Sequence, residues 1–586
     1  MKKLPVGISD FKDVVEGNYS YVDKTLFIKE IMDKGDKILL IPRPRRFGKT
    51  LNLSMLKYFY DCCPPTVHRD SEFAGPGGKI PGSKKGIPLH SYKELFDSLA
   101  IMQAGSEYQE KIGKHPVIFL SFRGIKEPDM DSCLNRIKQL IQDEYARHYY
   151  LLESKKLLPF EMDYFKRIID LKGDKADYGN SLEKLLKFLA RHYGKRAVIL
   201  IDEYDAPVHA GFTNDYYEDI IDFMRNFLCG GLKDMDQYLE KSVLTGIMRI
   251  AKESIFSGLN NLGVYTLLAE EFNDKFGFTE NEVEELLKEF RLTGRYEGVR
   301  RWYNGYIFGN RVVYNPWSVI NFLGSEGKEL KPYWLNTSDN RIVESLLSKG
   351  GKELKEELEL LIRGEEIKKV VEENIILKDI SIDEDLLWSF LLMGGYLKPT
   401  GKSREPGTEL MSYTLAIPNQ EVMAVYIRIV KRYFTTKIEN KKLEIMLKAL
   451  IDGDVGLFEK MLRKVVLAVF SYHDFGGEPE KVYHALVAGL LIWITGTHEI
   501  ISNRESGFGR YDIMIIPRDR SLTGYVIEFK AMDPEDGELP DAALDAALNQ
   551  IEEKKYETQL KERGIKNIKK MAIAFCGKKV YVRCKT

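Results

Sequence analysis

The chain has 586 residues, of which 44% are hydrophobic and 30% are charged, and its formal net charge is -1. This length exceeds what one hydrophobic core usually supports, so we expect two to four domains. The near-zero net charge excludes a globally basic nucleic-acid-binding protein, and any such surface must be local. Six cysteines without zinc-ligand spacing indicate neither a disulfide scaffold nor a zinc module.

Nothing in the sequence indicates a membrane protein. The N-terminus lacks the apolar core of a signal peptide, and the most hydrophobic run, 485–494, is too short to span a bilayer. We interpret that run as a buried helix and the preceding His484 as a structural histidine. A cytoplasmic protein without a membrane partner is the expectation.

Four short apolar runs alternate with helical segments in the first half of the chain. Continuous rather than alternating hydrophobicity is typical of strands that are covered by helices on both faces. A weaker fifth strand is expected at 264–268. The pattern predicts an α/β fold with a doubly wound parallel sheet. The four runs are 37–42, 116–122, 197–205 and 242–247.

The first run leads directly into RPRRFGKT (43–50), and a segment with helical spacing follows it. The end of this stretch matches a phosphate-binding loop, G-x-x-x-x-G-K-[ST], although an arginine stands where the first glycine would be. In such a loop Gly48 and the helix N-terminus would cradle phosphates, Lys49 would reach the β and γ phosphates, and Thr50 would bind Mg²⁺. A chance GKT on a basic turn is the alternative, and the strand and helix on either side favour the nucleotide site.

The basic residues of this loop have two interpretations. Pro44 fixes its own φ and disfavours helical geometry at Arg43, so the chain must enter the loop by a route other than a glycine turn. Arg45 and Arg46 would then supply phosphate-binding charge. Alternatively, they point outward as a basic patch for DNA or a neighbouring subunit.

Acidic and polar residues follow the third and fourth runs. Asp202 and Glu203 end an apolar strand, as in a Walker B element, where the aspartate supports Mg²⁺ and the glutamate polarises the attacking water. Thr245 would sense the γ-phosphate, and Arg249 would stabilise transferred charge, either in its own subunit or in a neighbour. The alternatives are an acidic strand end that caps a loop and an Arg249 that pairs with a local carboxylate.

The C-terminal region contains a second candidate site. Residues 509–532 read as two strands joined by a turn, so Glu528 and Lys530 project from one face. A hairpin centred near Arg520 places Asp512 opposite Glu528. Two carboxylates held that close repel each other unless a hard divalent cation lies between them. The metal would activate water, while Lys530 orients the nucleophile or stabilises developing negative charge.

Ordered motifs along the whole chain resemble the AAA-ATPase-like family, whose members look like P-loop ATPases fused to a C-terminal PD-(D/E)XK nuclease domain. The resemblance implies that the arginine-rich loop is the family's own form of the P-loop. Tyr511 stands in place of the nominal proline of the nuclease motif. The motifs are YVDKT (21–25), RPRRFGKT (43–50), DEYDAP (202–207), TGIMRIAKESIFSGLNNL (245–262), FGFTE (276–280), WYNGY (302–306), YNPWS (314–318) and YW-x-NTS (333–338).

This resemblance implies an ATPase core (1–270), a helical lid (271–345) in which the aromatic motifs pack, and an α/β restriction-endonuclease-like domain (441–586). The segment between them is rich in Lys and Glu and helical in pattern, from LLSKGGKELKEELELLIRGEEIKKVVEE onward, and we interpret it as a helical linker (346–440).

The resemblance also extends the second site. It adds Glu505 as a further metal-binding carboxylate and Gln550 as a catalytic residue. For Lys554 and Tyr556 we favour an ordinary packing helix with a solvated face. The basic tail beyond Lys561 either contacts phosphates or protects a sheet edge.

The leading hypothesis is an ATP-binding and ATP-hydrolysing protein with a metal-dependent nuclease domain that acts on nucleic acid, with DNA expected. ATP and Mg²⁺ are the expected cofactors, and Mn²⁺ is an alternative at the nuclease site. A nucleotide-regulated switch or scaffold, whose nuclease fold binds without cutting, is the second hypothesis. A P-loop kinase or small-molecule ATPase lacks a second substrate motif and comes last. A homo-oligomer is compatible with either of the first two hypotheses.

Overall fold

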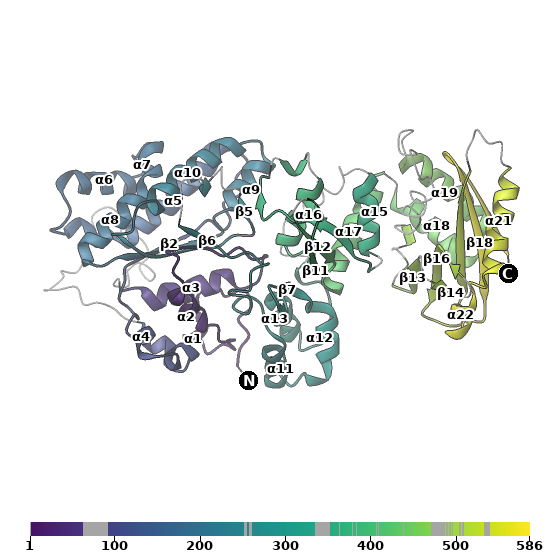
Figure 1. Cartoon of the computed structure of the whole chain (residues 1–586), viewed down its shortest axis with the longest axis horizontal. Coiled ribbons are helices and arrows are strands. Elements are labelled where there is room, and N and C mark those ends of the chain that lie inside the picture. The colour runs from purple at the N-terminus through teal and green to yellow at the C-terminus, as the bar shows by residue number, and fades with distance from the viewer. Residues whose placement is uncertain are drawn as a thin grey trace. The chain divides into compact units, whose positions relative to one another are not determined.

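The structure is a computed structural model of the chain (Figure 1). It divides into two compact units, Met1–Asp339 with Lys368–Glu421 and Asn340–Ile367 with Val422–Thr586. In the described part, no helix has the length and apolar character needed to cross a membrane. The described residues are 2–62, 92–250, 255–256, 259, 261–334, 352–362, 364–377, 379–381, 384–405, 407, 410–437, 439–469, 487, 490–491, 494, 496–502, 505–506, 509–532 and 539–585.

A five-stranded parallel sheet in the order β2-β3-β4-β1-β6 forms the centre of the first unit and confirms the predicted fold class. Its strands are β1 (Ile38–Leu40), β2 (Val117–Ser121), β3 (Ala197–Asp202), β4 (Leu239–Leu244) and β6 (Leu262–Val264).

The predicted bounds of the fifth strand were wrong, because β6 ends where that strand was expected to begin. The chain turns after β6: the Thr266 hydroxyl accepts a hydrogen bond from the Leu268 amide, and the Thr266 carbonyl accepts one from the Ala269 amide.

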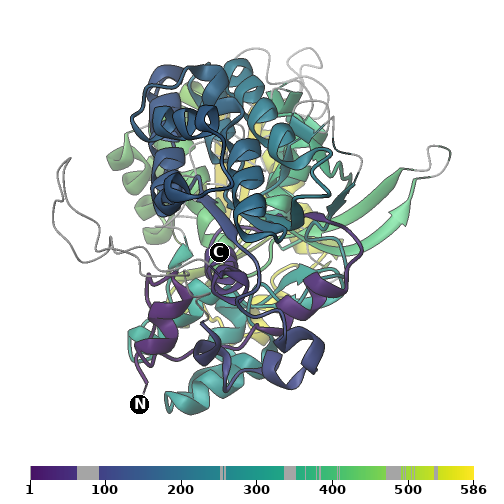
Figure 2. The same cartoon turned by 90° about the vertical axis from the view of Figure 1, so that its left-hand side faces the viewer.

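Helices cover both faces of this sheet. In Figure 1, α5, α8 and α10 lie on one side of the strands, and α1, α2 and α3 lie on the other; Figure 2 shows the same separation from a perpendicular direction. The helices are α1 (Phe11–Glu16), α2 (Leu26–Asp33), α3 (Lys49–Tyr60), α4 (Ser106–Gln109), α5 (Met130–Arg147), α6 (Pro159–Ile169), α7 (Lys175–Gly179), α8 (Ser181–Tyr193), α9 (Ala206–Thr213) and α10 (Tyr217–Leu232). Short 3₁₀ turns occur at Lys93–Phe96, Ala100–Gln103, Tyr149–Glu153, Thr293–Arg295 and Asp379–Ser381.

A mainly helical lid follows the sheet, as expected. It begins at Thr279, whose capping box with Glu282 starts α11. Its buried core includes the aromatic side chains Tyr303 and Tyr314, in agreement with the packing interpretation of those motifs. The lid elements are α11 (Glu280–Glu289), α12 (Tyr296–Tyr303), the hairpin β7 (Tyr306–Phe308) and β8 (Arg311–Val313), and α13 (Pro316–Gly324).

The segment expected to be a helical linker also contains strands. The Lys/Glu-rich run that indicated helices covers only its first helix, whereas aromatic and β-branched residues such as Tyr413 and Thr414 favour extended backbone. Its elements are α15 (Lys352–Ile362), β9 (Ile367–Val370), β10 (Asn374–Ile375), α16 (Glu384–Met393), β11 (Lys398–Arg404), β12 (Met411–Ala416) and α17 (Gln420–Lys437). Strands β11, β12 and β9 form one sheet, and Figure 2 shows the long β11–β12 hairpin in green.

The second unit contains a sheet in the order β13-β16-β17-β18-β19, in which β17 and β18 are parallel and the other pairs are antiparallel. Helices α18 and α19 pack on one face and α21 and α22 on the other, each with its own apolar core (Figure 1). Of the predicted buried run 485–494, the described residues Val487, Leu490 and Leu491 are buried; His484 lies outside the described residues. The elements are α18 (Asn440–Asp452), α19 (Val455–Val469), β13 (His498–Ser502), β14 (Glu505–Ser506), β15 (Gly509–Arg510), β16 (Ile513–Pro517), β17 (Gly524–Ala531), α21 (Pro540–Glu553), α22 (Thr558–Glu562), β18 (Ile568–Cys576) and β19 (Lys579–Lys585).

Candidate nucleotide and nuclease sites

The carboxylate of Asp202 lies fully buried at the carboxyl end of β3 and accepts hydrogen bonds from three hydroxyl groups. Thr50, at the start of α3, donates at 2.7 Å, and Thr245, directly after β4, donates at 2.8 Å. Ser121, the last residue of β2, donates at 3.3 Å. The structure thus brings Thr50, Asp202 and Thr245 together at one sheet edge. Ser121 was not predicted, because only the β2–β3 register places it beside Asp202.

The predicted phosphate-binding loop connects β1 to α3. Gly48 has φ +83° and caps α3, a left-handed conformation that glycine adopts without steric cost. The Lys49 side chain is buried, and its Nζ donates to the backbone carbonyls of Arg43 at 2.7 Å and Pro44 at 3.0 Å. Burial lowers the pKa of Lys49, and the carboxylates of Glu203 and Asp205 oppose that shift.

Arg43, which replaces the first glycine of a standard loop, is fully buried. Its guanidinium donates to the carbonyls of Pro42 at 2.8 Å and Tyr265 at 2.7 Å, and more weakly to those of Glu271 and Phe272. It also lies over the rings of Phe276 and Phe308. Burial lowers the pKa of Arg43 to about 9. These contacts make Arg43 a structural residue that ties the loop to the segment after β6.

Arg45 and Arg46 are half-buried at the same loop. Arg46 has a left-handed backbone, with φ +70°, which is uncommon for a residue that carries a Cβ atom. Its guanidinium lies 4.2 Å from the ring centroid of Trp317 in α13, a cation–π contact between the loop and the lid. Burial lowers the pKa of Arg46.

Glu203 follows Asp202 with a positive φ of +50°. Strained backbone of this kind occurs often at functional sites, because the surrounding structure must hold it. Burial raises the pKa of Glu203, Lys49 lowers it, and Asp202 and Asp205 raise it further. A carboxylate with a raised pKa and a fixed backbone suits the predicted role of polarising a water molecule.

The rest of the DEYD motif positions the chain after β4. Asp205 accepts hydrogen bonds from the amides of Ile247 at 2.7 Å and Met248 at 3.3 Å. The Tyr204 hydroxyl donates to the Met248 carbonyl at 2.8 Å and accepts from the Ile250 amide at 3.0 Å. Both side chains fall inside the DEYDAP motif, but the sequence alone does not predict these contacts, because the partners lie more than 40 residues further along the chain.

Arg249 is not joined to the Asp202 group by any contact in the described structure. It lies in β5 (Arg249–Ile250), which pairs in parallel with β10, opposite Asn374. Its Nε is buried, and among the described residues it has no hydrogen-bond partner. The expected roles of Arg249 in charge stabilisation or in pairing with a local carboxylate therefore stay predictions.

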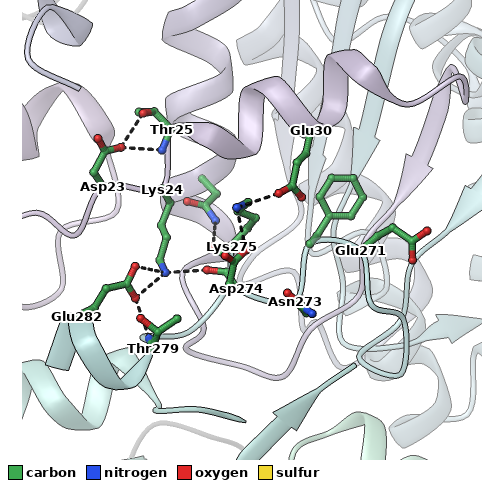
Figure 3. Close-up of polar contacts among 12 residues, drawn as sticks. Asp23, Lys24, Thr25, Glu30, Glu271, Asn273, Asp274, Lys275, Thr279 and Glu282 are labelled. Carbon is green, nitrogen blue, oxygen red and sulfur yellow. Dashed lines mark hydrogen bonds and ion pairs between the residues drawn. The ribbon is translucent and has the colours of Figure 1, made fainter. Parts of the chain in front are cut away.

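Partly buried polar contacts tie the core to the lid and to the residues just before it (Figure 3). The Nζ of Lys24 donates at 2.7 Å to both carboxylate oxygens of Glu282 in α11 and to the Asp274 carbonyl. Asn52 of α3 donates to the Lys275 carbonyl at 2.9 Å. The start of the lid is therefore held both by the segment before β1 and by the helix that follows the phosphate-binding loop.

In the second unit, the observed β16–β17 register confirms the predicted hairpin centre. Ile513 pairs with Ile527 and Ile515 with Tyr525, so both pairs are centred on residue 520. The Asp512 carboxylate accepts a hydrogen bond from the Phe529 amide at 2.7 Å, which holds it beside Glu528 on the neighbouring strand.

Gln550 of α21 joins the two charged side chains of β17. Its Nε2 donates to Glu528 Oε1, and its Oε1 accepts from Lys530 Nζ at 3.0 Å. Glu528 is only 3% exposed, and Phe529 packs into the core on the opposite face, as the strand alternation predicts. The structure thus brings Asp512, Glu528, Lys530 and Gln550 together.

Tyr556 is closer to this group than expected. It is buried, and its hydroxyl lies 3.4 Å from Gln550 Nε2. Its pKa is raised, mainly by burial and then by the negative charges of Glu528 and Asp512. Lys554, in contrast, is exposed at the end of α21, as expected of a solvated face.

Both groups of residues offer ligands that suit a divalent cation. Carboxylate and hydroxyl oxygens are hard donors, which Mg²⁺ and Mn²⁺ prefer. Asp512 and Glu528 supply them in the second unit, and Thr50 and Asp202 in the first. Within the described part of the chain, no three Asp, Glu, His or Cys side chains are grouped so that they could hold a metal ion together. Glu505 lies in β14 opposite Arg510, and its side chain is outside the described structure.

The basic tail forms β18 and β19, and several of its cations are paired. Arg583 contacts Asp541, and it contacts Asp545 at 2.7 Å. Lys570 lies 3.7 Å from Glu557 and 3.9 Å from Glu552. These ion pairs favour a structural role for this part of the tail.

Two regions of the chain match known families. Residues 5–73 and 87–256 match the family described as Predicted AAA-ATPase, and residues 478–585 match the PD-(D/E)XK nuclease superfamily. A protein of Azotobacter chroococcum mcd 1, named "Uncharacterized protein in vnfD 5'region", is 27% identical over 426 residues, which cover 72% of this chain and 69% of the relative. The chain thus joins an AAA-ATPase-like domain to a C-terminal domain of the PD-(D/E)XK nuclease superfamily, as its motifs predict.

Proposed function

We propose that this protein binds and hydrolyses ATP and that its C-terminal domain is a divalent-metal-dependent nuclease that acts on DNA. The observation that carries the proposal is the meeting of Asp512, Glu528 and Lys530 around Gln550. Two carboxylates and a lysine on neighbouring strands supply both the ligands for a metal and a cation for the reacting phosphate. A scaffold that only binds nucleic acid has no need of that combination.

In the first unit, Lys49 would bind the β and γ phosphates of ATP, aided by Arg45 and Arg46. Thr50 and Asp202 would hold Mg²⁺, and Thr245 would keep the Asp202 carboxylate in place through its 2.8 Å hydrogen bond. Glu203, whose pKa is raised by burial, would accept the proton of the attacking water. Arg249 would stabilise charge on the transferred phosphate, within one subunit or across a homo-oligomer.

In the second unit, Asp512 and Glu528 would hold the cation, with Glu505 as a third carboxylate. The metal would polarise the scissile phosphodiester and lower the pKa of its water. Lys530 would orient the nucleophile or stabilise the negative charge that develops on the phosphate. Gln550 would fix both Lys530 and Glu528, since it hydrogen-bonds to both. Nucleotide binding in the first unit would govern access of the nuclease to DNA.

The test is cleavage of plasmid and single-stranded DNA with Mg²⁺ or Mn²⁺, with and without ATP. The wild type is compared with Lys530→Ala and Lys49→Ala, and Lys554→Ala serves as a matched control because it removes an exposed lysine close to the site. We expect metal-dependent cutting that is lost in the Lys530 variant and kept in the control. Lys49→Ala then shows whether ATP governs cutting. Intact ATP binding without cutting under any condition would favour the nucleotide-regulated switch.

A further inference from the structure

Arg123 lies at the same sheet edge as the proposed ATPase residues. Strand β2 pairs in parallel with β3, with Ser121 opposite Asp202, and the Phe122 amide donates to the Asp202 carbonyl at 2.9 Å. Arg123 is the next residue and therefore follows the strand end beside Glu203. In the sheet order, β3 lies between β2 and β4, so Arg123 approaches Glu203 from the side away from β1.

Several cations crowd around this point. The pKa of Arg46 is lowered by burial first and then by the positive charges of Arg123 and Arg45, while the negative charge of Glu203 raises it, so these charged groups lie near one another. Arg123 is exposed, and Arg45 and Arg46 are half-buried. Among the residues that the structure describes, none of the three arginines forms an ion pair or a hydrogen bond to a carboxylate; the side-chain contact of Arg46 is with the Trp317 ring. Like charges gathered at one sheet edge repel each other, and an anion bound between them offsets that repulsion.

We propose that Arg123 contacts the terminal phosphate of a bound nucleoside triphosphate, on the side of Glu203 away from β1. This inference rests on the proposed nucleotide site. Lys49 and the helix N-terminus hold the phosphate chain from the loop, and a guanidinium from the end of β2 offers charge-assisted hydrogen bonds to the γ-phosphate oxygens. The diphosphate lacks this group, so the contact distinguishes ATP from ADP.

The contact predicts an unequal loss of affinity. In Arg123→Ala we expect the affinity for a non-hydrolysable ATP analogue to fall about tenfold or more, the effect of losing one charge-assisted hydrogen bond, and the affinity for ADP to stay within about twofold. Arg123→Lys keeps the charge but not the forked geometry and is expected to lie between the two. Because Arg123 is exposed, the variants should unfold at the wild-type temperature.

The experiment uses the full chain and measures binding of ADP, of the ATP analogue and of single-stranded DNA, together with ATP hydrolysis. The control is Arg136→Ala, which should match the wild type, because Arg136 is exposed in α5 and, among the described residues, its side chain hydrogen-bonds only to Gln139, at 3.0 Å. Equal loss of both nucleotides, or no loss, overturns the inference. Faster hydrolysis with unchanged affinity also overturns it, since Arg123 would then restrain Glu203. A change confined to nucleic-acid binding would assign the arginine to a phosphodiester instead.

A wrong assignment of the nucleotide site itself would give different binding results, in the wild type and in Lys49→Ala. If the wild type binds neither nucleotide, or if Lys49→Ala binds both as well as the wild type does, the proposed nucleotide site is refuted and the inference with it. If the wild type binds both nucleotides and Lys49→Ala weakens both, the site stands. The affinities of the Arg123 variants for ADP and for the ATP analogue then show whether Arg123 contacts the terminal phosphate.

Discussion

Glu421 is a buried carboxyl group at the start of α17, and within the described part of the chain its hydrogen bonds come from neutral donors. Both of its oxygens accept from the Ser318 hydroxyl at 2.8 Å, and Oε1 also accepts from the Trp334 amide at 2.8 Å. Burial raises its pKa from 4.5 to about 7, and the hydrogen bonds from Trp334 and Ser318 only partly offset this effect. The folded protein therefore holds a proton on Glu421 at a pH where the unfolded chain has lost it.

The sign and size of the effect follow from this difference. Between pH 4.5 and about 7 the folded state binds more protons than the unfolded state, so the free energy of unfolding falls as the pH rises. At 1.36 kcal/mol per pH unit, the whole loss is about 3 kcal/mol and is complete above pH 7. Glu421→Gln removes the titrating group. We expect the variant to be more stable than the wild type by up to about 3 kcal/mol at pH 8.5, with little advantage at pH 4.5.

Urea unfolding followed by tryptophan fluorescence, at several pH values between 4.5 and 8.5, measures this difference in the first unfolding transition. Glu329→Gln is the matched control, because Glu329 is exposed and, in the part of the chain that the structure describes, its carboxylate pairs only with the exposed Lys331. It should follow the wild type at every pH to within about 0.5 kcal/mol. The same pH dependence in wild type and Glu421→Gln would refute the reasoning, because it would mean that Glu421 is ionised in the folded protein at neutral pH.

Three further predictions concern single side chains. Gln550→Ala should lower nuclease turnover about 10- to 100-fold without weakening DNA binding, because it frees the side chains that Gln550 positions, and Asn549→Ala should have no effect in the same assay. The buried Glu144 has its pKa lowered to about 2, so Glu144→Gln should cost about 3 kcal/mol in urea unfolding at pH 7, less as the pH falls below 4.5 and almost nothing near pH 2. Trp317→Ala should weaken ATP binding about three- to tenfold by releasing Arg46, whereas Trp317→Phe should keep most of the affinity; equal affinities in a nucleotide titration would contradict this.

Local sequence patterns predict the strands of the parallel sheet and the pairing of the 513–527 hairpin, because both depend on residues that are close together in the sequence. Continuous apolar runs predict the parallel strands, and the symmetry of the 513–527 hairpin about residue 520 predicts that Asp512 lies beside Glu528. In the hairpin, the short turn leaves a single pairing register. In the parallel sheet, the alternation of strands and helices places the carboxyl ends of all strands at one edge. The sequence therefore predicts that Thr50, Asp202 and Thr245 lie at the same edge of the sheet, where both hydroxyl groups bond to the Asp202 carboxylate.

Contacts between segments distant in sequence were harder to predict. Ser121 and Arg123 carry no motif, and their positions depend on which strand lies next to β3. The strands β11 and β12 fall in a segment whose Lys/Glu pattern suggested helices throughout. That pattern failed there because charged residues indicate a solvent-exposed surface, which helices and strands can both provide. For Tyr556, sequence spacing indicated only a packing helix, whereas the structure adds a contact to Gln550.

The missing glycine of the phosphate-binding loop shows what such a long-range contact contributes. A glycine at position 43 would give the loop a flexible entry, whereas Arg43 fixes that entry through its bonds to the Pro42 and Tyr265 carbonyls. The same guanidinium lies over the ring of Phe308 in β7, so the loop and the lid share one buried guanidinium. Lys49 bonds to the carbonyl of that same arginine. A nucleotide whose phosphates bind Lys49 would break the bond between Lys49 and the Arg43 carbonyl. The change would reach the lid through the Arg43 side chain, and a glycine at position 43 has no side chain that could transmit it.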